Sequence, residues 1–384
     1  MTWNSARLSD IAKIDRSQVD PGKITSGTKY LGLEHIEAGG RILGAQSVQR
    51  GELKSSKFQF SKEHVLYGKL RPYLAKISLP DFEGICSTDI LPVRPGPDLD
   101  RKFLAYYLRQ PSVVQEANGR STGANLPRLS PKALAEMDIP CPPIDEQRRI
   151  AEILDKADAI RRKREQALDL ADEFLKSVFL EMFFGQTAAW PTAPMRSVAE
   201  LINGDRSSNY PSGKDIVAEG VLFLSTKNIS NSRIVLSNKQ FITKEKFESL
   251  SRGKLQRHDL VVTLRGSIGQ CAIFDCEYET GFINAQLMIL RPSQDLMPTY
   301  LHRLMTHPVI QHKLTDTKSG SAIPQLTARQ IGDLEIPVPP LDVQREFAEI
   351  ERRVASVYSK MIADQKQAEA LFGSISQRAF RGEL

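Results

Sequence analysis

The chain has 384 residues, of which 41% are hydrophobic, and a formal net charge of +6 at pH 7. This length suits two domains of ordinary size. No segment approaches the roughly 20 consecutive apolar residues of a membrane helix, the first residues lack a secretion-signal pattern, and the four cysteines lack zinc-site spacing.

Residues 1–143 have the pattern of a compact α+β domain. Short β-rich runs such as Tyr30 to Leu33 alternate with turns that contain Gly or Pro, and a brief helix is predicted at Arg101 to Arg109. The domain ends at Ile139-Pro-Cys-Pro-Pro143. Proline fixes φ and lacks the amide donor, so this run cannot lie inside a helix.

A single long helix is predicted over residues 144–185. No Gly or Pro interrupts the chain from Asp145 to Phe184, and Asp145 lies in the first turn, where the helix dipole favours an acid. Such a helix has a length of about 60 Å. Gly185 is expected to end it, and residues 186–194 are the expected linker.

The second half of the chain repeats the first. Residues 123–153 and 320–350 share 13 identical pairs at a constant offset of 197. A second α+β domain is therefore predicted over residues 195–340, followed by a second long helix over residues 341–384.

Upstream of these segments the offset drifts, which indicates that the two halves differ by short insertions in their N-terminal parts. The aligned pairs there are Leu31 with Leu224 at 193, and Leu70-Arg71 with Leu264-Arg265 at 194.

Apolar residues spaced three and four apart run along both predicted helices. From Ile150 to Glu181, and again from Phe347 to Arg378, eight of ten such positions are apolar. The positions include Ile160, Phe174, Val357 and Leu371. This seam predicts that the helices pack as an antiparallel coiled coil with pseudo-twofold symmetry. The alternative is that each helix belongs only to the core of its own domain.

The positive charge lies on the globular parts. The two helices together have a net charge of −2, and the rest of the chain has +8. An excess of this kind permits binding to nucleic acid.

The motif Pro-Pro-x-x-x-Gln occurs at Pro142 and again at Pro339, each time directly before a long heptad helix. Together with Asp259-Leu-Val-Val-Thr-Leu-Arg-Gly-Ser-Ile-Gly269 and the final Ala379-Phe-Arg-Gly-Glu-Leu384, it resembles the specificity subunits of type I restriction-modification enzymes. The resemblance covers essentially the whole chain. It implies two target-recognition domains, and two helices that serve as a spacer and as a docking surface for modification (methyltransferase) subunits.

The resemblance further implies a non-catalytic subunit that recognises a bipartite, asymmetric double-stranded DNA target with one half-site per domain. Methyltransferase, dinucleotide-binding and Walker A motifs are missing from the sequence. We therefore expect no cofactor and no metal on this chain. The resemblance implies that S-adenosylmethionine binds to the modification subunits and ATP to the restriction/translocase subunits, and the four cysteines suit a cytoplasmic location. The rival interpretation is a coiled-coil interaction scaffold without DNA specificity.

The candidate DNA contacts lie on polar loops at aligned positions. Sequence readout needs donors and acceptors that reach base edges, while Lys and Arg on phosphates set the register. The candidates in the first domain are Lys69, Arg71, Arg120, Asn125 and Arg128. The candidates in the second domain are Arg265, Ser267, Lys318, Ser321 and Gln325. The alternative in the second domain is that Gly266 and Gly269 only form a tight hairpin.

Overall fold

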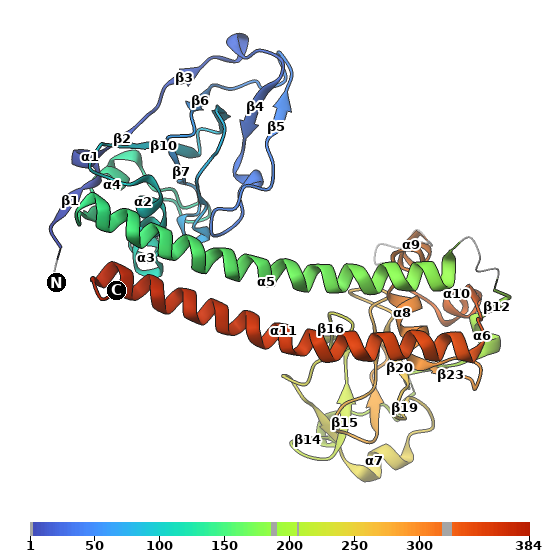
Figure 1. Ribbon diagram of the computed structural model, residues 1–384. Coiled ribbons are helices and arrows are strands. Elements are labelled where there is room, and N and C mark those ends of the chain that lie inside the picture. Colours follow the sequence, from blue (N-terminus) through green and yellow to red (C-terminus); the bar gives the residue numbers. More distant parts are fainter. Residues whose placement is uncertain (1–2, 186–189, 206, 317–324) are drawn as a thin grey trace. The chain divides into compact units, whose positions relative to one another are not determined.

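The computed structural model describes residues 3–185, 190–205, 207–316 and 325–384. The chain forms two compact units (Figure 1). The first unit comprises residues 1–167 and 361–384, and the second unit comprises residues 168–360. Each unit therefore contains one β-rich domain and a part of both long helices.

The first unit is built on separate β-sheets. Its strands are β1 (Ser5–Arg7), β2 (Ala12–Ile14), β3 (Gln18–Val19), β4 (Thr28–Leu31), β5 (Gln46–Val48), β6 (Lys57–Phe60), β7 (Val65–Gly68), β8 (Ile77–Ser78), β9 (Gly84–Cys86), β10 (Ile90–Pro95) and β11 (Asp138–Pro140). One sheet has the antiparallel order β2-β10-β7-β8. Another has the order β3-β6-β9-β4-β5, in which β4 and β9 are parallel. The strands β1 and β11 pair with each other.

Short helices cover the first unit's four-stranded sheet. They are α1 (Leu8–Ile11), α2 (Arg101–Leu108), α3 (Pro111–Gly119) and α4 (Pro131–Ala135), with 3-10 turns η1 (Pro21–Lys23), η2 (Leu33–His35) and η3 (Pro72–Leu74). The Asp100 side chain accepts hydrogen bonds from the backbone amides of Lys102 and Phe103, so α2 begins at Arg101. Phe103 and Leu104 are fully buried against strand residues such as Leu91. The predicted helix at this position is confirmed.

The second unit repeats this arrangement. Its strands are β12 (Thr192–Pro194), β13 (Ala199–Asn203), β14 (Ile216–Val217), β15 (Val221–Leu224), β16 (Ile229–Ser230), β17 (Arg233–Ile234), β18 (Phe241–Ile242), β19 (Lys254–Leu255), β20 (Leu260–Thr263), β21 (Cys271–Ile273), β22 (Gly281–Ile283), β23 (Leu287–Pro292) and β24 (Glu335–Pro337). Its short helices are α6 (Met195–Val198), α7 (Lys244–Ser249), α8 (Pro298–Thr306), α9 (Pro308–Asp316) and α10 (Ala328–Gly332), with turns η4 (Gly213–Asp215) and η5 (Thr226–Asn228). The order β13-β23-β20-β21 matches β2-β10-β7-β8, and β12 pairs with β24 as β1 pairs with β11.

The two units also share individual hydrogen bonds. The Leu8 amide donates to the Met137 carbonyl, and the Met195 amide donates to the Leu334 carbonyl, both at 2.9 Å. Along the chain, Met195 and Leu334 are farther apart than Leu8 and Met137. The extra residues of the second unit therefore lie between its strands, in connections that the sheet tolerates.

The long helices begin and end close to their expected bounds. Helix α5 (Ile144–Phe184) and helix α11 (Leu341–Arg381) have 41 residues each. Both follow a Pro-Pro pair, and Asp145 and Asp342 lie in their first turns, where the dipole favours an acid. At Gly185 a Cβ atom would lie 2.5 Å from the Glu181 carbonyl oxygen, so α5 ends at a residue without a side chain.

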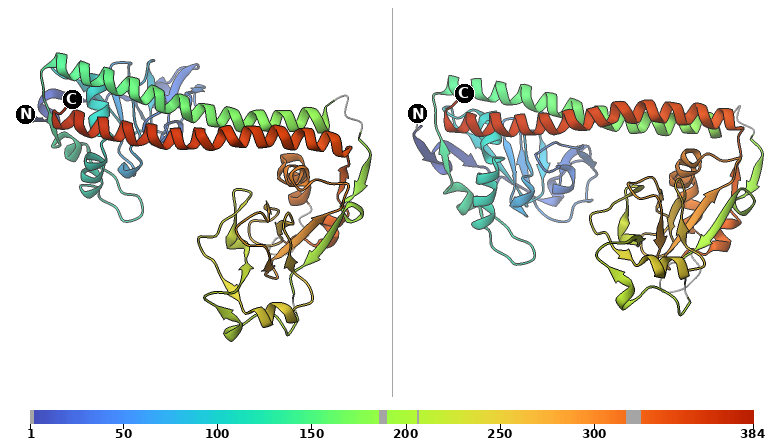
Figure 2. Two further views of the ribbon diagram at one scale, coloured as in Figure 1. Left: turned by 60° about the horizontal axis from the view of Figure 1, so that its bottom comes forward. Right: turned by 90° about the horizontal axis from the view of Figure 1, so that it is seen from below.

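In the first unit, the start of α5 lies beside the end of α11 (Figure 2). Arg149 donates a hydrogen bond to the Leu384 carbonyl at 3.0 Å, and Arg164 donates one to the Asp364 carbonyl at 2.5 Å. A later residue of α5 thus meets an earlier residue of α11. The helices run antiparallel here, as predicted.

In the second unit, the end of α5 packs on the start of α11 through aromatic rings. Phe179 and Phe183 lie 5.2 and 5.5 Å from Phe347, measured between ring centroids. Phe183 also contacts Tyr300 of α8 at 4.6 Å. The helix pair is therefore continuous with the core of the β-rich domain. The expected fold class is confirmed: α+β, with a long helix after each of two similar domains.

Part of the predicted seam is wrong. Ile160, Phe174, Val357 and Leu371 were expected inside it, but all four side chains are more than half exposed. The buried positions of α5 are Gln147, Ile150, Ala151, Leu154, Asp158, Leu175, Phe179 and Phe183, of which only Ile150 is one of the ten predicted seam positions. Each helix has two apolar stripes, and periodicity alone does not say which of them faces a partner.

Candidate nucleic-acid interface

In the first unit, the segment after β7 is hydrogen-bonded to the segment before α4. The Lys69 carbonyl accepts from the Leu129 amide at 2.9 Å, and the Arg71 amide donates to the Pro127 carbonyl at 2.8 Å. These backbone bonds bring together the two loops on which the candidates of this unit lie.

Lys69 and Arg128 share one carboxylate. Oδ1 of Asp89 lies 3.9 Å from Lys69 Nζ and 3.3 Å from Arg128 Nε. The Lys69 amide also donates to the Asp89 carbonyl at 2.9 Å, which holds the two residues together through the backbone. All three side chains are partly exposed. We call Lys69, Asp89 and Arg128 the Asp89 cluster; its donors and its acceptor are accessible to a ligand.

Arg71 lies beside the Asp89 cluster in a strained backbone conformation. Its φ is 52°, in the left-handed region that costs a residue with a side chain about 1–2 kcal/mol. Its side chain is exposed, and within the described part of the chain it forms no ion pair. Strained residues of this kind gather at functional sites. The Arg71 guanidinium is available to a phosphate or a base edge.

The other two candidates of the first unit lie apart from the Asp89 cluster's charges. Arg120 follows the last turn of α3, where its guanidinium pairs with Glu116 at 2.6 Å and donates to the Glu136 carbonyl at 3.4 Å. Asn125 is exposed in the loop closed by the Thr122–Arg128 bridge. The structure therefore brings three of the five candidates together and holds Arg120 on its own helix.

The second unit has the same set of backbone hydrogen bonds around the residue that follows the strand, and we call this set the frame of each domain. The Leu264 amide donates to the Gln286 carbonyl at 2.8 Å, and the Leu326 amide donates to the Leu264 carbonyl at 2.9 Å. Arg265 and Gln325 form a β-bridge, and Arg265 Nε donates to the Gln325 side-chain oxygen at 2.8 Å. Two candidates of this unit, Arg265 and Gln325, are thus in direct contact.

Ser267 lies in a tight hairpin between β20 and β21. Its carbonyl accepts from the Thr263 hydroxyl, and the Gly269 amide donates to the Thr263 carbonyl at 2.9 Å. The hairpin explains the backbone here, while the Ser267 side chain remains exposed. The last two candidates, Lys318 and Ser321, lie outside the described residues.

The equivalent hydrogen bonds correct the sequence alignment by one residue. Lys69 makes the bonds that Leu264 makes, so the predicted pairing of Leu70 with Leu264 is wrong. The repeated Leu-Arg letters favoured that pairing, but strand register decides the position. Arg71 therefore matches Gly266, whose φ of 78° is also left-handed. One domain places an arginine where the other uses the residue that this conformation favours.

Sequence reasoning missed Asp89 and Gln286. They occupy equivalent positions of the repeat and hold Lys69 and Leu264 by the same backbone bond. The constant offset that pairs Arg94 with Arg291 could have found them. Asp89 has the charge opposite to that expected of a DNA contact, and neither residue lies in the loops that hold the predicted candidates.

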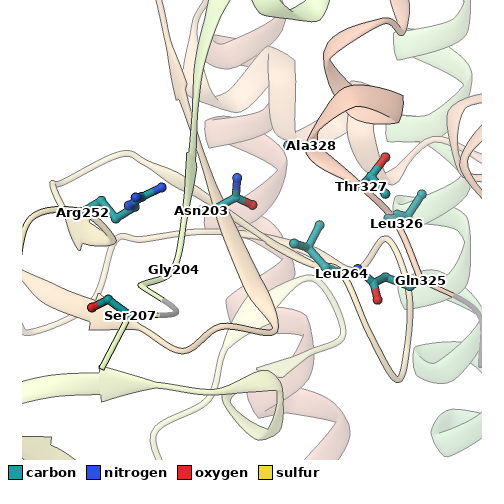
Figure 3. Close-up of a pocket in the computed structure, with 9 residues that line it drawn as sticks. All are labelled: Asn203, Gly204, Ser207, Arg252, Leu264, Gln325, Leu326, Thr327 and Ala328. Atoms are coloured by element: carbon teal, nitrogen blue, oxygen red, sulfur yellow. The ribbon is translucent and has the colours of Figure 1, made fainter. Parts of the chain in front are cut away.

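Two cavities flank this frame in the second unit. One has a volume of about 510 Å³, and Figure 3 shows Gln325 beside Leu264 at one side of it and Arg252 at the other. Its lining residues are Asn203, Gly204, Ser207, Arg252, Leu264, Gln325, Leu326, Thr327 and Ala328. The other, of about 560 Å³, is lined by Gln286 together with Thr226, Lys227 and Lys239. Arg252 was not predicted, because no motif surrounds it.

The described residues contain no cluster of His, Cys, Asp or Glu that could hold a metal ion. None of the helices in the described ranges is long and apolar enough to span a bilayer.

The comparison with protein families decides what kind of chain this is. The model of the type I restriction modification DNA specificity domain matches residues 1–170 and 190–367. The chain belongs to this family. The two matched segments correspond to the two repeats, so both β-rich domains are specificity domains.

Curated relatives are type I specificity subunits. That of the Escherichia coli enzyme EcoDI is 28% identical over 212 residues, which are 54% of this chain and 46% of that subunit. That of EcoKI from E. coli strain K12 is 26% identical over 321 residues, 76% of this chain and 67% of that subunit. The matches thus span about half to two thirds of these relatives.

Solved structures share the fold. A chain from a structure described as the basis of complex assembly and conformational transition of the type I R-M system has a TM-score of 0.62 at 20% identity, with 100% of this chain and 98% of that chain covered. The type I S subunit from M. genitalium has a TM-score of 0.58 at 13% identity, with 98% and 96% covered.

Proposed function

We propose that this specificity-domain protein reads a bipartite, asymmetric DNA sequence, with one half-site for each domain. The observation that carries the proposal is a common backbone frame with different side chains. Lys69, Arg71 and Asp89 of the first domain stand where the second has Leu264, Gly266 and Gln286. Because donors and acceptors on base edges differ between base pairs, two such surfaces select different sequences.

The described charges suit this role. The candidate cations of the first frame are partly or fully exposed, and Arg265 is exposed in the second. Cations at such positions can hold phosphates, which raises affinity for any duplex, or donate to base edges, where polar groups discriminate sequences.

The protein itself directs chemistry that partner subunits perform. In this proposal, modification subunits bind S-adenosylmethionine, restriction/translocase subunits use ATP, and the complex acts on cytoplasmic DNA. The exposed apolar residues of the long helices supply a docking surface for the modification subunits. Leu170 and Phe174, one helical turn apart on α5, are 63% and 52% exposed, as large apolar residues at interfaces often are.

The test is reconstitution. Binding to long random duplex DNA is measured by fluorescence anisotropy with and without the modification subunits, and adenine methylation is mapped in a genome that carries all subunit genes. We expect one split sequence to be methylated, and only when this chain is present. Methylation that does not depend on this chain would contradict the proposal and favour an interaction scaffold without DNA specificity. The proposal would also be contradicted if substitutions in the two frames left the methylated sequence unchanged.

A further inference from the structure

The position shared by Asp89 and Gln286 lies at the centre of both frames. In each domain, the carbonyl of this residue accepts a hydrogen bond from the backbone amide of the residue just after β7 or β20, at 2.9 and 2.8 Å. The backbone position of this residue is therefore the same in both domains. In the first domain it is a carboxylate, and in the second it is an amide.

In the Asp89 cluster, one acceptor lies between two donors. The Asp89 carboxylate is 3.9 Å from Lys69 Nζ and 3.3 Å from Arg128 Nε, and the three side chains are 27%, 21% and 45% exposed. Ion pairs that water can reach contribute little to stability, so these partly exposed side chains can exchange partners easily. Two cations and one carboxylate leave the cluster with a net positive charge, which favours approach to DNA.

This set of groups complements one kind of base pair. In the major groove, guanine presents two acceptors, N7 and O6, and its cytosine partner presents an N4 amino donor. Lysine and arginine donate to guanine, and an Asp carboxylate accepts from cytosine. We propose that Asp89 is a specificity-determining residue and that the Asp89 cluster reads a G·C base pair in the half-site of the first domain. This inference rests on the proposed function.

The second domain provides the contrast. With Gln286 and Gln325 at the positions of Asp89 and Arg128, its frame offers amides and Arg265 but no carboxylate at the aligned position. Amide side chains pair well with adenine. The G·C requirement assigned to Asp89 is therefore specific to one half of the target.

The experiment uses the full chain assembled with its modification subunits. Asp89→Asn keeps the shape of the side chain and removes its charge. Binding is measured to the natural target and to duplexes in which each G·C pair of either half-site is replaced in turn. We expect discrimination at one G·C pair of the first half-site to fall about tenfold, while the second half-site is read as before. Binding to random duplex should become tighter and more salt-dependent, because Lys69 and Arg128 lose their internal acid.

Matched variants keep the test decisive. Glu63→Gln removes the acid that Arg94 contacts at 2.9 Å in the same unit, so it controls for the loss of one ion pair. Asp89→Glu retains a carboxylate and should retain the G·C preference, even if Asp89→Asn proves unstable in thermal unfolding.

Three outcomes overturn the inference. The first is that Asp89→Asn leaves discrimination unchanged at every base pair. The second is that Glu63→Gln and Asp89→Asn have equal effects on discrimination. The third is that Arg128→Ala weakens binding to all sequences uniformly, since this would make Arg128 a phosphate contact. A wild-type complex without any sequence preference would instead contradict the proposed function itself.

Discussion

Gln147 and Gln344, at equivalent positions of the repeat, make the same three hydrogen bonds. The Gln147 side chain accepts from the Asp100 amide and donates to the carbonyls of Asp98 and Pro142, at 2.8 to 2.9 Å. Gln344 makes the equivalent bonds at 2.7 to 2.8 Å. Both side chains are almost fully buried. The glutamine of the duplicated Pro-Pro-x-x-x-Gln motif thus joins each long helix to the start of α2 or α8.

Replacing Gln147 with alanine should destabilise the first unit by about 1–3 kcal/mol, because two carbonyls and one amide lose a buried partner. Chemical denaturation measures the loss, and Gln344→Ala should have an effect of similar size on the second unit. Gln166→Ala, at an exposed position of α5, is the control and should change little. Equal stability of all three variants would show that water replaces the lost bonds.

Phe179 and Phe174 lie on the same helix with opposite exposure, 2% and 52%. Phe179→Ala should lower the free energy of unfolding by about 3–5 kcal/mol, because it leaves a cavity among aromatic rings. Phe174→Ala should leave unfolding nearly unchanged but weaken association with modification subunits, measured by analytical ultracentrifugation. Unaltered association would remove this part of α5 from the docking surface.

The conformation of Arg71 allows stability and DNA binding to be separated. Arg71→Gly should stabilise the first unit by up to about 1 kcal/mol, since glycine adopts a left-handed φ without strain. The same variant should bind DNA more weakly. Arg71→Lys keeps both charge and strain, and it should therefore keep the wild-type salt dependence. If Arg71→Gly binds DNA as the wild type does, the arginine is not a contact.

Asp15 makes the first unit sensitive to acid. Burial raises the pKa of this carboxyl, but hydrogen bonds from Lys13, His64 and Arg94 outweigh burial and lower the pKa to about 2. A carboxyl whose pKa is lowered by folding contributes stability above its unfolded pKa of about 4, and this contribution is lost as the pH falls from 4 to 2. Asp15→Asn should lower the free energy of unfolding at pH 6 by about 1–2 kcal/mol and reduce its dependence on pH below 4. Parallel pH profiles for both proteins would exclude this role.

The repeat, the two helices and their bounds could be predicted from sequence because they depend on local chemistry. Prolines, a glycine and first-turn acids define α5 and α11 without reference to the rest of the fold. The 13 identical pairs between residues 123–153 and 320–350 include this buried glutamine and the Pro-Pro pair before it, which form the helix junction in both units.

The loop frame could be predicted only in part. The sequence indicated the two loops that carry Lys69, Arg71 and Arg128, but not that backbone hydrogen bonds join these loops. The partnership with Asp89 depends on β7 and β10 being adjacent antiparallel strands, and the pairing of strands distant in sequence is not a local property. The exposed Ile160 and Phe174 were assigned to the seam for a similar reason, since burial depends on a partner that periodicity does not identify.

The contact between Arg149 and Leu384 has a consequence for the order of biosynthesis. Ala379, Phe380 and Leu384 from the far end of the chain belong to the hydrophobic core around Ile150 and Phe103. The core of the first unit is therefore incomplete until this distant segment has been synthesised. Until residues 361–384 have been synthesised, the first unit lacks part of its hydrophobic core, whereas the second unit has all of its residues once Lys360 has been made. Deleting residues 376–384 should therefore destabilise the first unit, although most of that unit is encoded more than 200 residues upstream.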